Sequence, residues 1–213
     1  MILNYLQSGN ITVLIISAIV MVMALIFHNI VQAWVASRYG DNSPRFAGFM
    51  RFDPQQQLEP FGVLFLFLLG FGWPKMIPVN SRNYRGRGQQ EAIVWYSGPA
   101  AYLLVGFVCV LIASILRAAG ASQDLFIAFI ASASYATLHA VINLFPVYPL
   151  DGAKAALVWG GPGVRRVIQQ IAQYGLLGFI VVFMVLNLLG ITSGLQNFFL
   201  RLFAAIVEAI PGL

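Results

Sequence analysis

The sequence is too apolar for a soluble globular domain. Of its 213 residues, 60% are hydrophobic and 9% are charged, whereas soluble domains carry about 25% charged residues. The single cysteine excludes an internal disulfide, and in so apolar a chain the net charge of +5 indicates membrane orientation and contact with anionic lipids rather than nucleic-acid binding. We therefore expect an all-α integral membrane protein with one membrane domain, residues 1–213.

The first predicted transmembrane helix covers residues 11–37, more than the roughly 20 residues that a crossing requires. Its second half contains His28, Asn29 and Gln32. Polar side chains are costly in hydrocarbon and often mark functional sites there. Since His28 and Gln32 are four residues apart, they share one face of the helix.

Two shorter features are expected before the second crossing. The stretch 38–60 contains "PRFAGFMRFDP", whose aromatic and small residues between prolines predict a short β-hairpin. The apolar run 61–72 makes about 18 Å of helix, too short for a hydrocarbon core of about 30 Å. Since basic residues flank it on both sides, we predict a re-entrant segment. A short true crossing through a thinned bilayer is the alternative.

Three further crossings are predicted, at residues 93–116, 125–145 and 174–191, giving about four transmembrane helices in all. Residues 196–210 place polar and apolar side chains on opposite sides, which predicts a C-terminal interfacial helix.

The basic residues predict the orientation. Of the twelve Lys and Arg, seven lie between the first and second crossings and three between the third and fourth. With a re-entrant segment at 61–72, these ten share one face, which should be cytoplasmic. The N-terminus would then lie outside, and the cytoplasmic membrane of a bacterium is the expected location.

Asp151 follows the third predicted crossing, after two prolines that turn the chain at 146 and 149. The turn allows Asp151 to approach His28 and Gln32 near the cytoplasmic face, where the three form a candidate metal site. Two structural interpretations remain open. The polar residues of the first helix would serve only as hydrogen-bonding partners between helices, or Asp151 would only cap a helix that begins at Gly152.

Four stretches, in order, resemble the site-2 protease family of intramembrane zinc metalloproteases: "FHNIVQAWVASRYGD", "EPFGVLFLFLLGFGWPKMIPVN", "GPAAY" and "NLFPVYPLDG". The resemblance covers residues from about 26 to 155. It implies a family-like core at about 11–155, with accessory helices at about 164–213.

The resemblance also implies a zinc site made by two histidines of the first helix and the aspartate of the "LDG" turn, with a glutamate as general base. His28 and Asp151 match this pattern. Asn29 stands at the base and Gln32 at the second histidine, while Tyr102 replaces an asparagine. Amide groups are poor zinc ligands, and an amide cannot accept the proton. No cofactor is therefore expected, except zinc if the site is functional.

The leading functional hypothesis is a pseudoprotease, a non-catalytic member of this family that binds a membrane protein or peptide segment. The family holds its substrate by strand addition beside the re-entrant region, here around residues 45–53 and 61–80. The candidate substrate-binding residues are Phe61, Gly62, Pro78, Asn80, Gly98, Pro99 and Asn143. Two alternatives are an active protease with unusual metal ligation and a small transporter or channel. His139 is expected to be a packed or water-bonded residue of the helix bundle.

Overall fold

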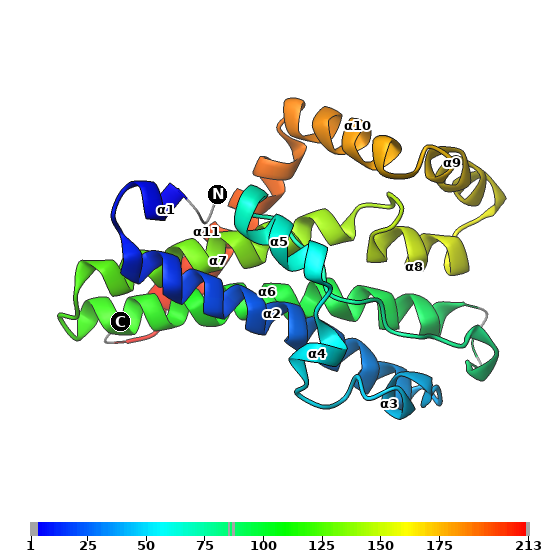
Figure 1. Ribbon diagram of the computed structural model, residues 1–213, viewed down its shortest axis with the longest axis horizontal. Helices are drawn as coiled ribbons and strands as arrows, with labels where there is room; N and C mark the ends of the chain where they lie inside the picture. Colours follow the sequence, from blue (N-terminus) through cyan, green and yellow to red (C-terminus); the bar gives the residue numbers. More distant parts are fainter. Residues whose placement is uncertain (1–3, 85, 87, 212–213) are drawn as a thin grey trace.

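Three long apolar helices form the body of the computed structural model, which describes residues 4–84, 86 and 88–211. They are α2 (Ile11–Arg38), α6 (Gln89–Ala118) and α7 (Gln123–Leu144), and each is long and apolar enough to cross a membrane. Figure 1 shows them side by side. On one flank lie α3 (Ser43–Phe46) and α4 (Pro54–Gln57), and on the other lie α8 (Asp151–Trp159), α9 (Pro162–Ala172) and α10 (Gly175–Leu188). Three of the four predicted crossings are thus confirmed as membrane-length helices.

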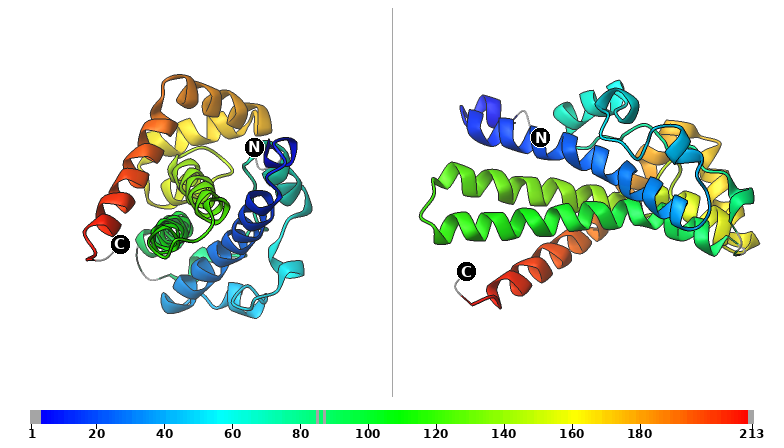
Figure 2. Two further views of the ribbon diagram at one scale, coloured as in Figure 1. Left: turned by 90° about the vertical axis from the view of Figure 1, so that its left-hand side faces the viewer. Right: turned by 90° about the horizontal axis from the view of Figure 1, so that it is seen from below.

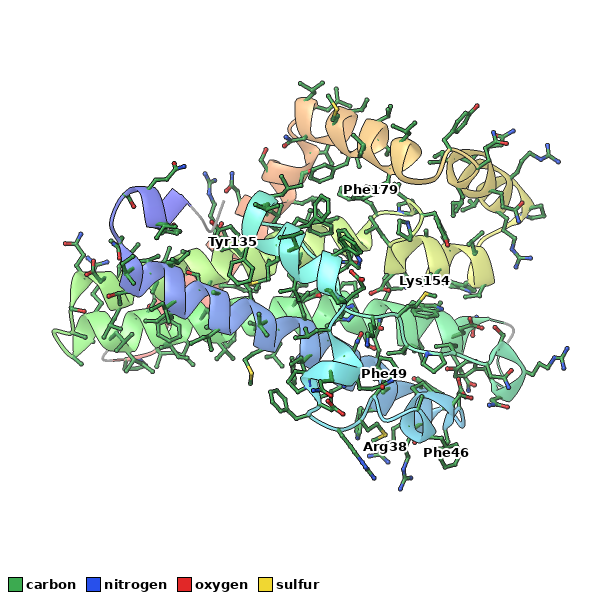
Figure 3. The ribbon with its side chains drawn as sticks, in the orientation of Figure 1. Arg38, Phe46, Phe49, Tyr135, Lys154 and Phe179 are labelled. Atoms are coloured by element: carbon green, nitrogen blue, oxygen red, sulfur yellow. The ribbon has the colours of Figure 1, made fainter. Side chains whose placement is uncertain are left out.

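The fourth predicted crossing corresponds to α10 (Gly175–Leu188), whose 14 residues make only about 21 Å of helix. It reaches membrane length only together with α9 (Pro162–Ala172), and this pair is bent by 110°. Phe179 of α10 faces the rest of the fold (Figure 3), where its ring centroid lies 6.3 Å from that of Phe71. The remaining short elements are α1 (Asn4–Gln7), η1 (Ser81–Asn83) and α8 (Asp151–Trp159).

Small residues allow α6 and α7 to run close together along their length (Figure 2). Ala133 and Ala136 are fully buried, and a Cβ at Gly106 would lie 2.8 Å from the hydroxyl of Thr137. That hydroxyl donates to the carbonyl of Ala133, 2.7 Å away, within its own helix. Close backbone approach and satisfied hydroxyl groups are what helix pairs need where water is absent.

The predicted β-hairpin at 38–60 is wrong. This stretch forms two helical turns, α3 (Ser43–Phe46) and α4 (Pro54–Gln57). Each has a proline in its first turn, where the fixed φ of proline favours helix initiation. Asp53 then caps α4 by accepting the N–H groups of Gln55 and Gln56. In the described part of the chain, the only β-type pairing is an isolated bridge between Leu58 and Pro74.

The predicted re-entrant segment does return to its starting point. The helix α5 (Pro60–Leu69) has ten residues and ends at Gly70, whose positive φ of 78° reverses the chain. The extended backbone that follows runs back along α5, and the Lys75 N–H donates to the Gln57 carbonyl at 2.8 Å. Gly62 and Gly72 make this reversal possible, because a Cβ on either would collide with the opposite backbone.

The C-terminal helix α11 (Ile191–Glu208) covers the α6–α7 pair over part of its length. Phe203 and Val207 are buried against Cys109, Val110 and Ala133. The side-chain amide of Gln196 donates to the carbonyl of Ser134 at 2.9 Å. A second apolar face stays exposed, at Phe198, Leu202 and Ile206. A helix with one packed face and one free apolar face suits the predicted interfacial position, which stays a prediction.

The close contact of Gly62 in α5 allows a test of the chain reversal that follows this helix. Gly62→Ala should lower the free energy of unfolding by about 1–3 kcal/mol, because the added methyl group has no space. Gly194→Ala in α11 is the matched control, since nothing lies within 4 Å of its Cβ position, and it should be neutral or raise stability by up to about 1 kcal/mol. Thermal unfolding in detergent measures the stability of both variants. Equal unfolding temperatures for Gly62→Ala and Gly194→Ala would contradict the close packing of α5 on the extended chain that follows it.

Candidate functional site

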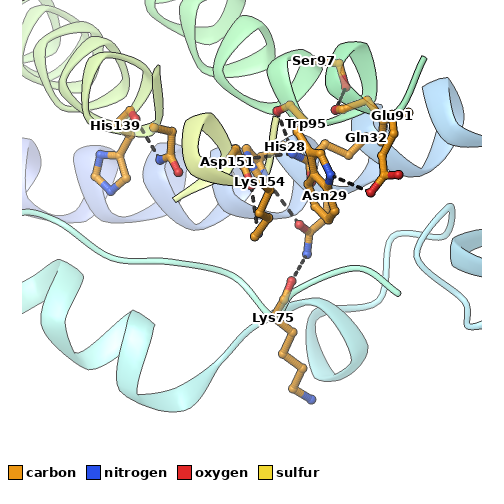
Figure 4. Close-up of polar contacts among 12 residues, drawn as sticks. His28, Asn29, Gln32, Lys75, Glu91, Trp95, Ser97, His139, Asp151 and Lys154 are labelled. Carbon is orange, nitrogen blue, oxygen red and sulfur yellow. Dashed lines mark hydrogen bonds and ion pairs between the residues drawn. The ribbon is translucent and has the colours of Figure 1, made fainter. Parts of the chain in front are cut away.

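The carboxylate of Asp151 lies at the centre of a buried polar cluster formed by α2, α6 and α8 (Figure 4). Its Oδ2 lies 2.7 Å from Nε2 of His28 and accepts a hydrogen bond from Nε2 of Gln32 at 2.9 Å. The same Gln32 amide donates to the Trp95 carbonyl at 3.1 Å. The structure thus brings Asp151 together with His28 and Gln32, which precede it by more than a hundred residues in the sequence.

The turn before α8 places Asp151 in this position. The third long helix ends at Leu144, and α8 begins at Asp151 itself. Gly152 is packed so closely against the carbonyls of Leu144 and Phe145 that no side chain would fit. The hydrogen bonds of the Asp151 carboxylate in the described chain run to side chains, not to the N–H groups of α8. Helix capping therefore does not account for this residue.

Lys154 brings a positive charge to the cluster, one turn after Asp151. Its Nζ lies 3.0 Å from Oδ1 of Asp151 and 4.4 Å from the centre of the Trp95 ring. Burial alone would raise the pKa of the Asp151 carboxyl, but the charge of Lys154 and the contact with His28 outweigh it and hold that pKa below its usual value. The carboxylate is therefore ionised, and each of its oxygens has a protein partner.

Asn29 points in another direction, toward the chain that returns from α5. Its Nδ2 donates to the carbonyl of Lys75 at 2.8 Å and lies 3.5 Å from that of Gln57. Its Oδ1 lies 3.2 Å from Nδ1 of His28. Both ring nitrogens of His28 therefore face an oxygen atom of the protein, and neither is left without a partner.

The side chains of this polar cluster do not fit the ligand set of a catalytic zinc centre. Such a centre takes three protein ligands from His, Cys and carboxylates. The described residues contain no group of three or more His, Cys, Asp or Glu that could hold a metal. Gln32 directs its N–H₂ group, a hydrogen-bond donor, toward the Asp151 carboxylate. Only His28 and Asp151 remain as ligands of the required kind.

Gly98 and Tyr102 on α6 complete the wall of the cluster. A Cβ at Gly98 would collide with Nε2 of His28, so glycine is needed for α6 to pass this close. The Tyr102 ring stacks on the His28 ring, with centroids 4.7 Å apart and planes 27° apart. Tyr102 thus fills, with a flat ring, the space beside the histidine.

The amino-acid sequence is similar to two curated bacterial proteins. It is 29% identical over 173 residues to "Putative zinc metalloprotease YwhC" of Bacillus subtilis (strain 168), and the match covers 78% of each chain. It is 28% identical over 187 residues to "Putative zinc metalloprotease Rip2" of Mycolicibacterium smegmatis (strain ATCC 700084 / mc(2)155), covering 84% of this chain and 68% of the relative. These two relatives support a site-2-protease-like family for this chain.

Neither a family model nor a solved structure matches the chain. The bacterial relatives and the three membrane-length helices together indicate a bacterial integral membrane protein. The resemblance recognised in the four motifs is thereby confirmed at the level of the family.

The candidate substrate-binding residues of this family member do not form one surface. Phe61 and Pro78 are exposed, whereas Gly62, Gly98 and Pro99 are buried at close backbone contacts or beside them. Asn143 donates to the His139 carbonyl at 2.9 Å, within α7. Asn80 caps η1 by accepting the N–H of Arg82. The contacts of Gly62, Asn143 and Asn80 hold the protein's own backbone in place, as structural residues do.

His139 is packed in the bundle, and it also fixes the chain that returns from α5. Its Nδ1–H donates to the Tyr135 carbonyl at 2.7 Å, while its Nε2 accepts the backbone N–H of Gly72 at 3.0 Å. The sequence offered no indication of this second contact, because it joins α7 to a loop 67 residues away.

Residues 72–80 form an extended stretch, hereafter the edge segment. The side chain of Ile77 is 2% exposed and that of Met76 is 66% exposed, the alternation of a strand that is buried on one face. In the described chain, Met76, Ile77 and Val79 make no backbone hydrogen bond. The middle of the edge segment is therefore extended backbone without a pairing partner in the described chain.

Asp41 holds the far end of the edge segment. Its Oδ2 accepts the Asn80 N–H at 2.8 Å and the Tyr84 hydroxyl at 3.2 Å, while its Oδ1 accepts from Ser43 and Asn83. Burial would raise the pKa of this carboxyl, but the hydrogen bonds from Ser43, Asn80 and Asn83 outweigh burial and lower it. Asp41 and Lys154 were not among the predicted site residues. The spacing of Lys154, three residues after Asp151 on a helix, was the available indication.

Asp41 gives a pH-dependent prediction. Since its folded pKa lies below the ordinary value, its stabilisation is complete above about pH 5 and is lost as the pH falls from about 4 toward the folded pKa. Asp41→Asn should lower the unfolding temperature at neutral pH and reduce its decline between about pH 5 and pH 3.

The matched control is Asp53→Asn, which keeps a good N-cap for α4 and should behave as the parent does. Thermal unfolding of the three proteins across this pH range is the measurement. A parent and an Asp41→Asn variant with parallel pH profiles would refute the role of the ionised carboxylate.

Proposed function

We propose that this protein is a non-catalytic member of the site-2-protease-like family that binds an extended segment of a membrane protein at residues 76–79. The observation that carries the proposal is the arrangement of the polar cluster. Its acidic group is occupied by His28, Gln32 and Lys154, while the nearby edge segment has free backbone groups at residues 76–79.

The residue types oppose peptide hydrolysis. A metalloprotease needs a metal held by three protein ligands and a base that takes a proton from water. In this chain the amide of Gln32 stands at the position of the second histidine ligand, and the amide of Asn29 stands at the position of the base. The amide of Asn29 is already committed as a donor to a backbone carbonyl. General base help is worth roughly 10² to 10⁴ in rate, so these two changes together should remove ordinary zinc peptidase activity.

The edge segment supports binding without catalysis. Unpaired strands readily accept another extended chain, because each new backbone hydrogen bond satisfies a group on both partners. Met76 and Pro78 expose their side chains beside the free groups, and apolar side chains suit a membrane segment. Strand addition of this kind needs no metal.

We further propose that the basic face is cytoplasmic and contacts anionic lipids. Ten of the twelve basic residues lie in the two connections at that face. On α9, Arg165 and Arg166 are exposed while Ile168 is buried. A helix with exposed basic side chains and a buried apolar side chain is suited to a position on a membrane surface with negatively charged headgroups.

An active metalloprotease is the second candidate, favoured by the names of the two relatives. Metal analysis of the detergent-purified protein distinguishes the two. We expect zinc well below one equivalent, because the protein offers only two ligands of the usual kind. Gln32→His should raise bound zinc by adding a third ligand beside His28 and Asp151.

Gln32→Met is the matched control and should leave the zinc content unchanged. One equivalent of zinc in the parent, removed by His28→Ala, would overturn the non-catalytic proposal and favour the protease.

The orientation is tested by cysteine labelling in a Cys109→Ala background. Arg51→Cys and Arg165→Cys should react with an impermeant maleimide from the cytoplasmic side, and Arg117→Cys at the other end of α6 from the outside. Labelling of Arg51→Cys and Arg165→Cys from opposite sides would contradict the shared basic face.

A further inference from the structure

The edge segment is attached to the fold at three places. At its start, the Gly72 N–H donates to His139. At Lys75, the N–H donates to the Gln57 carbonyl and the C=O accepts from Asn29. At its end, the Asn80 N–H donates to Asp41. Residues 76–79, the free part, begin directly after the attachment at Lys75.

Asn29 makes the only side-chain hydrogen bond seen at Lys75 C=O in the described chain, at 2.8 Å. The Asn29 side chain itself is buried, with 1% of its surface exposed. Its orientation follows from its neighbours: the amide nitrogen faces two carbonyl oxygens, and the amide oxygen faces Nδ1 of His28. Position 29 is therefore a hydrogen-bond donor toward the edge segment.

We infer that Asn29 is a positioning residue that ties the edge segment to α2 and thereby keeps residues 76–79 in an extended, bindable form. This inference rests on the proposed function for its biological meaning, but its structural content stands on the Asn29 contacts alone. An acidic side chain at this position would direct a negative oxygen toward the carbonyls of Lys75 and Gln57. It would then weaken the attachment that the amide makes.

Asn29→Asp isolates this contact. Aspartate has nearly the same shape and keeps an oxygen beside His28, but it replaces the donor by an acceptor. Asn29→Ala is the second variant, because it removes the donor without adding charge. Gln32→Met is the matched control: it removes a buried amide one turn away on the same helix, with no contact to the edge segment.

Reactivity of Ile77→Cys toward a maleimide reports the attachment, because Ile77 is buried in the parent. The native Cys109, buried between α6, α7 and α11, reports the bundle in the same molecule. In detergent, Asn29→Asp and Asn29→Ala should each raise labelling at position 77 about tenfold, as expected for loss of a buried hydrogen bond. Cys109 should stay protected, and Gln32→Met should leave position 77 as it is in the parent.

Unchanged protection at position 77 in both Asn29 variants would overturn the inference. So would equal loss of protection at positions 77 and 109, because Asn29 would then support the whole bundle rather than the edge segment.

Binding is measured separately, with a single-span leucine-rich peptide that has an unwound Gly-Pro centre and one cysteine. Disulfide cross-linking of this peptide to Met76→Cys, in the Cys109→Ala background, should fall several-fold in Asn29→Asp but not in Gln32→Met. No cross-linking in the parent would refute the proposed function, whereas the labelling at position 77 would still decide the role of Asn29.

Discussion

The buried carboxylate of Asp151 is the constraint on which the surrounding structure depends. A charge inside an apolar bundle is tolerated only when it is paired and fully hydrogen-bonded. Here the partners come from two helices: His28 and Gln32 from α2, and Lys154 from α8 itself. Satisfying one acidic group thus fixes the distance between α2 and α8, and α6 must pass at Gly98, where it carries no side chain.

The high cost of polar groups in an apolar bundle also explains which features could be predicted from the sequence. Membrane-length helices follow from apolar runs alone, so α2, α6 and α7 were predictable. His28, Gln32 and Asp151 were found because polar residues in or beside such runs are rare and because four motifs occur in order. The hairpin predicted at 38–60 is wrong, because Pro44 and Pro54 each lie in the first turn of a short helix and not at the end of a strand.

Contacts between side chain and backbone were beyond the reach of sequence reasoning. The sequence places Asn29 at the position of the base, or among the hydrogen-bonding partners between helices, but it does not reveal that the amide binds the Lys75 carbonyl. His139 was expected to be a packed residue, which it is, but its bond to the Gly72 N–H depends on how α5 reverses. In both cases the partner is a main-chain group, which has no residue-specific pattern to detect. What a sequence reveals about a site is thus its side-chain chemistry, and not the backbone that the side chains hold.

Pro78 gives the edge segment an unequal supply of hydrogen-bonding groups. In extended backbone, alternate residues direct their N–H and C=O groups to the same side. The groups of Lys75 point toward Gln57 and Asn29, so Met76 and Pro78 present theirs on the opposite side. Because proline has no N–H, this side offers two acceptors but one donor. Two copies of the protein cannot satisfy each other fully through it, so the deficit of donors protects an open strand from pairing with itself.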